Sequence, residues 1–167
     1  KETNSFIYFS SQGNVHRGLD LLLDIFSSPN FPCALYECGP VESEMDFCSL
    51  YHHELFECKN IHLIGFIDIT SKAFENLCSK CCYTILPSCS EGQSGSVLTM
   101  MSAGIIPIVS KECGFNDSDV INLPDCSIDT IKSYILEYSK KEIEWCKEQS
   151  NKGLELVKTK YSMDSYR

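Results

Sequence analysis

A loop rich in serine and glycine carries a single carboxylate in the second half of the chain. Residues 88–95 read SCSEGQSG, and a helical pattern of apolar residues follows Gly95. A helix that begins in serine and glycine points free N–H groups and the positive end of its dipole at a ligand, which suits a phosphate. Glu91 would repel a phosphate, but a carboxylate accepts hydrogen bonds from sugar hydroxyl groups. The loop therefore predicts a site for a phosphorylated sugar or a nucleotide.

Apolar runs and helical patterns alternate along the chain and predict the elements that carry this loop. Six runs predict strands, at residues 6–10, 33–38, 61–64, 83–86, 105–109 and, more weakly, 120–123. Apolar spacing predicts helices over residues 19–26, 43–56, 71–81 with Ser71 as N-cap, after Gly95, and one or two helices over 127–157. Residues 161–167 are polar, and we expect them to fray or to belong to a helix that docks elsewhere.

This alternation defines the expected fold class. Short strands separated by helices predict an α/β fold, a Rossmann-like doubly wound parallel sheet of about six strands with helices on both faces. Ligands bind such sheets at the carboxyl ends of the strands. The polar loops after the first, third, fourth and fifth predicted strands all lie at that edge, so we expect them to form one site.

Three segments together resemble the donor-binding half of GT-B glycosyltransferases, in the group 1 family that retains stereochemistry and uses nucleotide-sugar donors. Residues 88–110 contain S-E-G, a small-residue loop, a helix ending in A-G, and then I-P-I-V-S. Residues 13–26 place Arg17-Gly18 where Lys-Gly is usual, and residues 60–67, NIHLIGFI, match the strand and loop that face the nucleotide base. The resemblance covers roughly residues 5 to 125.

The resemblance implies roles for particular residues. Glu91 is implied to be catalytic and to act on the transferred sugar. The implied diphosphate-binding residues are Gly13, Arg17, Ser94, Gly95, Ser96 and Val97, and those at the base and ribose are Gly65, Phe66, Ile67 and Thr99. The donor is a nucleotide diphosphate sugar, and neither a metal nor a cofactor is implied. The implied enzyme is a hexosyltransferase of the kind used in polysaccharide biosynthesis.

Two positions depart from the family pattern. Gln12 stands where an arginine is usual, and Thr99 stands where the pattern has a second glutamate. A threonine hydroxyl still hydrogen-bonds a ribose, though less strongly than a carboxylate. The departures bear on the identity of the donor and on the rate. For residues 10–13 an ordinary turn stays open as an alternative, and for Arg17 a surface salt bridge.

The resemblance also implies a domain organisation. We expect residues 1–167 to be a single nucleotide-sugar-binding domain, the C-terminal half of a two-domain enzyme whose N-terminal acceptor domain is absent. Because the sequence opens at Lys1 without an initiator methionine, we expect a fragment or a processed product. The resemblance implies that catalysis needs the second domain, so we expect this chain to be inactive alone. A sugar, lipid or protein acceptor, and any peripheral membrane association, would come through the missing half.

Composition excludes some classes of partner and indicates a compartment. The net charge is −9, and lysine and arginine do not cluster with aromatic residues, so nucleic-acid binding is disfavoured. The chain has eleven cysteines, and their odd number and scattered spacing predict reduced, core-packed thiols in a cytoplasmic protein. Cys78, Cys81 and Cys82 form the one zinc-like cluster, but a second C-x-x-C or histidine pair does not follow, so we expect packing and not metal.

Two other functions remain open from the sequence. One is a nucleotide-sugar epimerase or phosphorylase-like enzyme built on the same two-domain frame, although the additional ionisable or lysine groups it needs are not evident. The other is a degenerate, non-catalytic nucleotide-binding or interaction module. The neutral residues Gln12 and Thr99, at positions where the family has charged ones, suggest it.

Overall fold

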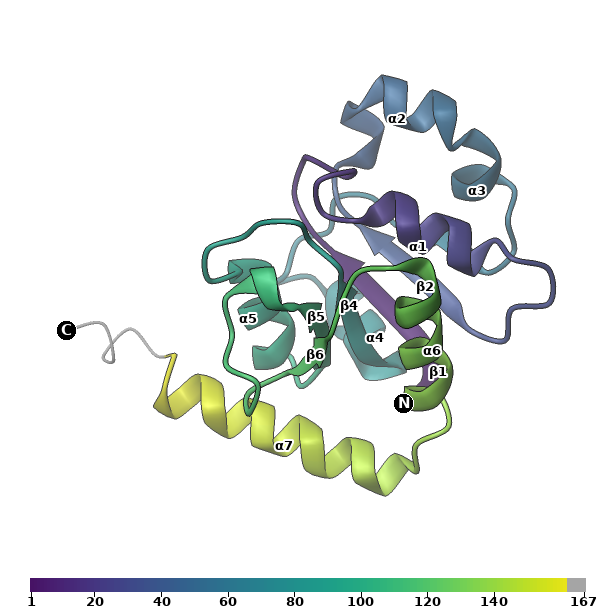
Figure 1. Cartoon of the computed structure of the whole chain (residues 1–167). Helices are drawn as coiled ribbons and strands as arrows, with labels where there is room; N and C mark the ends of the chain where they lie inside the picture. The colour runs from purple at the N-terminus through teal and green to yellow at the C-terminus, as the bar shows by residue number, and fades with distance from the viewer. Residues whose placement is uncertain (162–167) are drawn as a thin grey trace.

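The computed structural model describes residues 1–161 and contains a six-stranded parallel sheet between helices (Figure 1). The strand order is β3-β2-β1-β4-β5-β6. The strands are β1 (Glu2–Phe9), β2 (Ala34–Cys38), β3 (Ile61–Leu63), β4 (Cys81–Leu86), β5 (Ile106–Ser110) and β6 (Ile121–Leu123). The chain winds outward from the central pair β1 and β4 in both directions, so the predicted doubly wound Rossmann-like fold is confirmed.

The strands at the centre of the sheet form where most residues are apolar and buried. All six residues of β4 are buried, and so are all five of β5, because each strand has helices or loops over both faces. β1 and β4 pair in parallel, with Ile7 beside Thr84. β1 begins at Glu2, four residues before the predicted start, because its polar first residues still pair with the beginning of β4 at Cys81.

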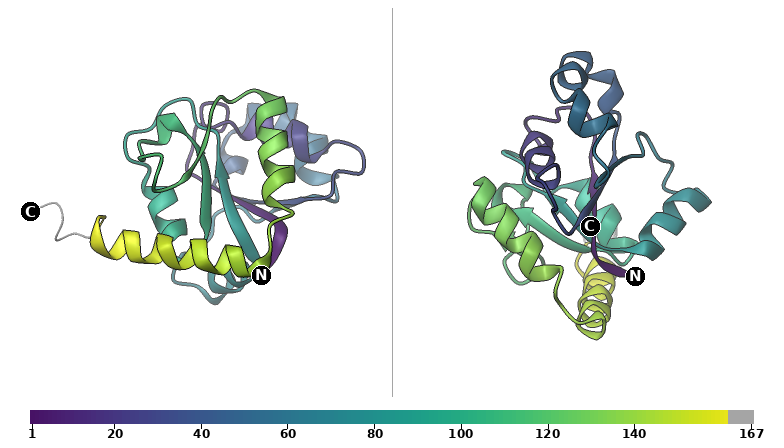
Figure 2. Two further views of the ribbon diagram at one scale, coloured as in Figure 1. Left: turned by 60° about the horizontal axis from the view of Figure 1, so that its bottom comes forward. Right: turned by 90° about the vertical axis from the view of Figure 1, so that its right-hand side faces the viewer.

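Helices cover both faces of this sheet. They are α1 (Leu19–Phe26), α2 (Met45–Leu50), α3 (His52–Phe56), α4 (Lys72–Lys80), α5 (Gly95–Ser102), α6 (Ile128–Tyr138) and α7 (Ile143–Thr159), with short 3-10 turns η1 (Val41–Ser43) and η2 (Lys111–Cys113). Figure 2 shows α1 and α6 on one side of the sheet and α4 on the other. Phe6 and Tyr8 of β1 belong to one apolar core and Ile7 to the other, because side chains alternate along a strand.

Helix boundaries confirm some predictions and correct one. The Ser71 hydroxyl accepts a hydrogen bond from the N–H of Phe74 at 3.2 Å, so the predicted N-cap of α4 is confirmed. The single helix predicted over residues 43–56 is wrong, because the backbone leaves the helical region at Tyr51 and separates α2 from α3. Phe47 and Leu55 reach the core from the two short helices, while Met45 and Leu50 stay exposed.

The C-terminal part forms two helices, α6 and α7, which settles the choice of one or two over residues 127–157. Within the tail, residues 162–167 lie outside the described residues. Tyr161 does not fray, since its hydroxyl donates to Asp119 at 2.7 Å. Over residues 1–161, no helix is both long enough and apolar enough to cross a membrane.

The cysteines are mostly core residues, as predicted. Seven of the eleven are buried, at positions 33, 38, 78, 81, 82, 113 and 146, and Cys89 is the exposed one. Burial raises the pKa of Cys81 to about 12 and that of Cys78 to about 11. These thiols therefore stay protonated near neutral pH and act as small apolar side chains.

Candidate functional site

The loops that follow β1 and β4 lie side by side at the carboxyl edge of the sheet. From β1 the chain leaves toward β2, whereas from β4 it leaves toward β5, so these two loops flank the point where the winding reverses. The backbone N–H of Cys89 donates to the carbonyl of His16 at 2.9 Å and joins the two loops directly. This is the place where open α/β sheets bind ligands, and the sequence predicted it.

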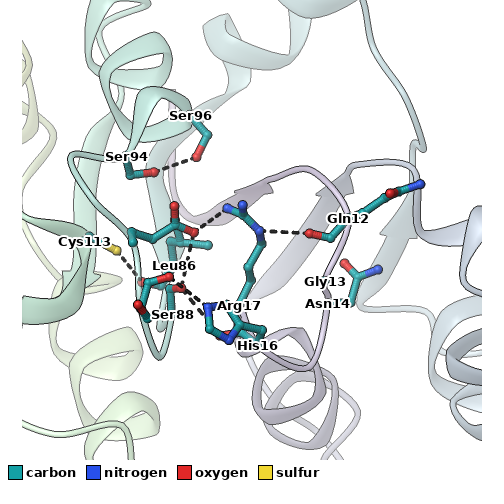
Figure 3. A network of polar contacts seen from close by, with 12 residues as sticks. Gln12, Gly13, Asn14, His16, Arg17, Leu86, Ser88, Ser94, Ser96 and Cys113 are labelled. Carbon is teal, nitrogen blue, oxygen red and sulfur yellow. Dashed lines mark hydrogen bonds and ion pairs between the residues drawn. The ribbon is translucent and has the colours of Figure 1, made fainter.

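Arg17 and Glu91 meet across these two loops. A guanidinium nitrogen of Arg17 forms an ion pair with a carboxylate oxygen of Glu91, and the side chains are 20% and 12% exposed. The Nε of Arg17 donates to the carbonyl of Gln12 at 3.1 Å, so the guanidinium spans its own loop and the next (Figure 3). The pair is shielded enough to count in the energetics of the site, unlike an exposed surface pair.

Glu91 is held by the loops that follow two neighbouring strands. Its carboxylate accepts a hydrogen bond from the Ser88 hydroxyl at 3.3 Å, and its N–H donates to the carbonyl of Glu112 at 3.0 Å. The Ser110 hydroxyl at the end of β5 donates to the Ser88 carbonyl at 2.6 Å. The ends of β4 and β5 therefore place the carboxylate beside Arg17 without a ligand.

The loop after β1 already holds an anion, which the sequence did not predict. Its backbone N–H groups at Gly13 and Asn14 both donate to the carboxylate of Glu44, at 2.5 and 3.3 Å. Gly13 has φ +93°, a conformation that favours glycine. Glu44 lies between η1 and α2. Gly39-Pro40 in the sequence predicted a turn before Glu44, but it did not predict this contact.

The beginning of α5 faces the same edge. Ser94 is buried at the N-cap position, and its hydroxyl lies 3.0 Å from that of Ser96. Gly95 has open space around its Cα, with no atom within 4 Å of the point where a Cβ would lie. The N–H groups in the first turn of a helix have no acceptor within the helix. The N–H groups of Gly95, Ser96 and Val97 therefore have no acceptor within α5, and their binding of a phosphate stays a prediction.

Residues 65–67 lie at the same edge but three strands from β4, roughly 14 Å away. Gly65 has φ +73°, and its N–H donates to the carbonyl of Glu37 at 3.3 Å. Phe66 is 81% exposed, whereas Ile67 packs partly against the core. The predicted base-facing segment thus lies two strands from β1, which leads to Arg17, and three from β4, which leads to Glu91, so a ligand that contacts all of them would have to be elongated.

Thr99 lies one turn into α5, as predicted from its position after Gly95. Its hydroxyl donates to the carbonyl of Gly95 at 3.0 Å, within its own helix. The same oxygen keeps its lone pairs for a ribose hydroxyl, so the contact is compatible with the predicted role without testing it.

A buried carboxyl lies beneath the site and was not singled out in the sequence. Glu37 on β2 is fully buried beside Tyr8 of β1, its partner in the sheet register. Burial raises the pKa of Glu37 to about 8. The Gly65 N–H acts in the opposite direction, although it does not reach hydrogen-bonding geometry with either carboxyl oxygen. In the sequence, Glu37 could have been noticed as the one charged residue inside the predicted apolar strand at residues 33–38.

A separate cavity of about 250 Å³ lies at the opposite edge of the sheet, where β4 and β5 begin and α7 crosses. Its lining includes Cys82, Ile106, Ile143 and Cys146. Two lysines line it, but Lys1 donates to the Gly104 carbonyl and Lys147 pairs with Glu144. The cavity lies at the amino ends of the strands, where such sheets do not usually bind their ligands. We therefore assign the site to the carboxyl edge.

Comparisons with solved structures identify the fold. The C-terminal domain of a glycosyl transferase group 1 family protein, LpcC, from Francisella tularensis is similar over 97% of this chain and 88% of its own, with a TM-score of 0.69 and 15% identity. The catalytic domain of cholesterol-alpha-glucosyltransferase from Helicobacter pylori is similar over 96% and 99%, with a TM-score of 0.70 and 11% identity.

A structure of TarM from S. aureus that contains UDP gives a TM-score of 0.73 at 16% identity, over 98% of this chain and 34% of its own. A scan of protein-family models found no match, and a search of curated proteins found none either. The fold is therefore that of the C-terminal domains of group 1 GT-B glycosyltransferases, as the three sequence segments predicted.

Proposed function

We propose that this chain is the donor-binding domain of a glycosyltransferase of the hexosyltransferase type. It would take part in moving a sugar, with retention, from a nucleotide diphosphate sugar to an acceptor hydroxyl. The observation that carries the proposal is the convergence of Arg17, Glu91 and the beginning of α5 at the switch point of this fold. The glycosyltransferases that share the fold, and the UDP in one of them, support it.

The charges of the site fit the two ends of such a donor. The N–H groups at the beginning of α5 and the Arg17 guanidinium would stabilise the negative charge that grows on the departing diphosphate. Glu91 would accept hydrogen bonds from hydroxyl groups of the transferred sugar. Because Arg17 pairs with Glu91, the carboxylate is neutralised and does not repel the diphosphate beside it.

The exposed Phe66 ring and the backbone of residues 65–67 would receive the nucleotide base, since a base stacks readily on an aromatic face. Thr99 would face the ribose. The acceptor, and an acid–base group from its side, would come from a second domain, so this chain alone would bind without turnover. The proposed compartment is the cytoplasm, because the free cysteines fit a reducing environment.

A panel of nucleoside diphosphates tests the proposal. Uridine, guanosine and adenosine diphosphates are each added to the chain, and the melting temperature is compared with that in the nucleosides alone. One diphosphate at a hundred times its Kd should raise the melting temperature by about 5–10 °C, while its nucleoside should not. A panel in which every diphosphate leaves the melting temperature unchanged would overturn the proposal.

A non-catalytic binding module is the second candidate, and the neutral residues at two charged family positions favour it. The Gln12 side chain donates to the Ser43 hydroxyl at 3.3 Å, and the Thr99 hydroxyl donates within its helix. Turnover of a nucleotide sugar by the longer protein separates the candidates. Tight diphosphate binding without any turnover would favour the module.

A further inference from the structure

Glu44 places a carboxylate where the proposed diphosphate would bind. One oxygen, Oε1, accepts from Gly13 at 2.5 Å and from Asn14 at 3.3 Å, and Oε2 lies 3.3 Å from the Asn14 N–H. Two successive backbone N–H groups that converge on one anion form a general anion-binding concavity. A carboxylate and a phosphate oxygen place the same demand on these donors, so they compete for them.

The second anion-binding group of the loop is also engaged. Arg17 pairs with Glu91, so in this state the loop presents neither an uncompensated positive charge nor free N–H groups at Gly13 and Asn14. Glu91 balances the charge of Arg17, whereas Glu44 is held by backbone N–H groups and its negative charge has no cationic partner among the contacts of residues 1–161. An incoming dianion would meet repulsion until Glu44 withdraws.

We propose that Glu44 is an internal competitor, which closes the anion-binding loop in the resting state and must leave when the donor binds. The identity of the anion rests on the function proposed above, but the competition itself does not. The released side chain has room, because an open hollow of about 650 Å³ lies next to it, lined in part by Val15, Met45 and Leu50. These three side chains are exposed, so no core packing opposes the movement.

A buried amide without a hydrogen-bond partner indicates that the loop has a second conformation of low energy. Asn14 is fully buried, and its Nδ2 has no hydrogen-bond partner among residues 1–161. Its Oδ1 receives only a long hydrogen bond, 3.4 Å, from the Tyr8 hydroxyl. A buried donor without a partner is costly. A loop shift that accompanies release of Glu44 would allow this amide to find a partner.

The test measures binding of two anions, UDP and inorganic pyrophosphate, by calorimetry. Glu44→Gln keeps the size of the side chain and removes its charge, and Glu44→Ala removes the contact. Glu42→Gln is the matched control, because Glu42 is exposed, lies two residues away and makes the same change in net charge. Melting temperatures establish that each variant is folded, and the amide NMR signals of Gly13 and Asn14 report the contact itself.

Both Glu44 variants should bind pyrophosphate and UDP about tenfold more tightly than the unaltered chain, on the scale of one charge-assisted hydrogen bond, while Glu42→Gln should not. Equal or weaker binding of both anions by the folded Glu44 variants would overturn the competitor role, even where UDP binds the unaltered chain. Tighter pyrophosphate binding without any UDP binding would support the competitor and contradict the proposed function. If no form binds either anion, both ideas fail.

Discussion

Arg17 and Glu91 illustrate how one contact can reconcile two opposed demands on a site. A donor needs positive charge at its diphosphate and hydrogen-bond acceptors at its sugar, within a few ångströms of each other. A carboxylate next to an anion is unfavourable unless its charge is compensated, and Arg17 compensates it here. Each member of the pair should therefore affect a different part of the donor.

Replacing Arg17 by alanine should weaken binding of a nucleoside diphosphate by roughly 1.5–3 kcal/mol, the contribution of charge-assisted hydrogen bonds. Calorimetry on the folded variant measures it. Lys72→Ala is the control, because Lys72 is exposed on α4 and pairs only with Glu75 among the described residues. Unchanged affinity in Arg17→Ala would remove this residue from the site and leave the ion pair as a purely structural contact.

Replacing Glu91 by glutamine should not weaken diphosphate binding by more than about threefold, because the variant removes a sugar contact and no phosphate contact, and it leaves the charge of Arg17 uncompensated. In the two-domain enzyme that the proposed function expects, the same change should cost turnover. The diphosphate and the intact nucleotide sugar are titrated side by side, so that the two parts of the donor are compared. A large loss of affinity for the diphosphate alone would contradict the assignment of Glu91 to the sugar.

At the residue scale, the motifs predicted which side chains lie at the carboxyl edge of the sheet but not which of them touch. Arg17 and Glu91 were both selected from local motifs, yet they are 74 residues apart and meet only because β1 and β4 are neighbours. Glu44 was missed because its segment read as the beginning of a longer helix. Its contact depends on the turn that η1 makes after Pro40. Assignment of the site residues to a donor remains a prediction.

At the element scale, Gly18 connects the two loops of the site. It precedes α1 with φ +75°, and a Cβ there would lie 2.4 Å from the carbonyl oxygen of Pro87, at the end of β4. The close approach of backbone to backbone keeps the loop after β1 against the loop after β4. A side chain at this position would push the two loops apart.

Gly18→Ala should therefore lower the free energy of unfolding by about 2 kcal/mol or more, from the left-handed backbone and the clash together. Chemical denaturation measures it. Gly92→Ala provides the comparison, because Gly92 lies in the neighbouring loop with nothing within 4 Å of its Cβ position. An equal loss of unfolding free energy in the two variants would show that a side chain at position 18 does not clash with Pro87.

The sequence predicted the elements best where burial is continuous. β4 and β5 are buried at every residue, and both were predicted, although β4 begins earlier because Cys81 and Cys82 pack like apolar residues. The predicted helix over residues 43–56 failed because its apolar spacing counted Met45 and Leu50, which face solvent. Periodicity alone does not distinguish a core residue from an exposed apolar one.

At the scale of the whole molecule, Glu37 links stability to pH. Its pKa in the folded chain is about 8, against an ordinary value of 4.5. Below the ordinary value both states hold the proton, and the group has no effect. Between the two values the unfolded chain loses its proton while the folded chain keeps it, so stability falls as the pH rises, and it levels off above about 8.

Glu37→Gln should remove this slope and raise the free energy of unfolding at about pH 8 by ~1–3 kcal/mol, the cost of a buried group without a good partner. Denaturation curves from about pH 5 to about pH 9 compare it with Glu148→Gln, a change of the same charge at an exposed position on α7. Parallel pH profiles of the unaltered chain and Glu37→Gln would show that the carboxyl is not protonated in the folded state.

The central claim is that a nucleoside diphosphate lies across the carboxyl edge of this sheet, from β3 to α5. Amide NMR of the labelled chain, titrated with the diphosphate that binds best in the panel, tests it most directly. The predicted result is a set of shifted signals at Gly13, Arg17, residues 65–67 and residues 94–97, with no change at Cys82 or Cys146. Shifts confined to the cavity at the opposite edge, or saturation without any shift at Arg17 and α5, would contradict the claim.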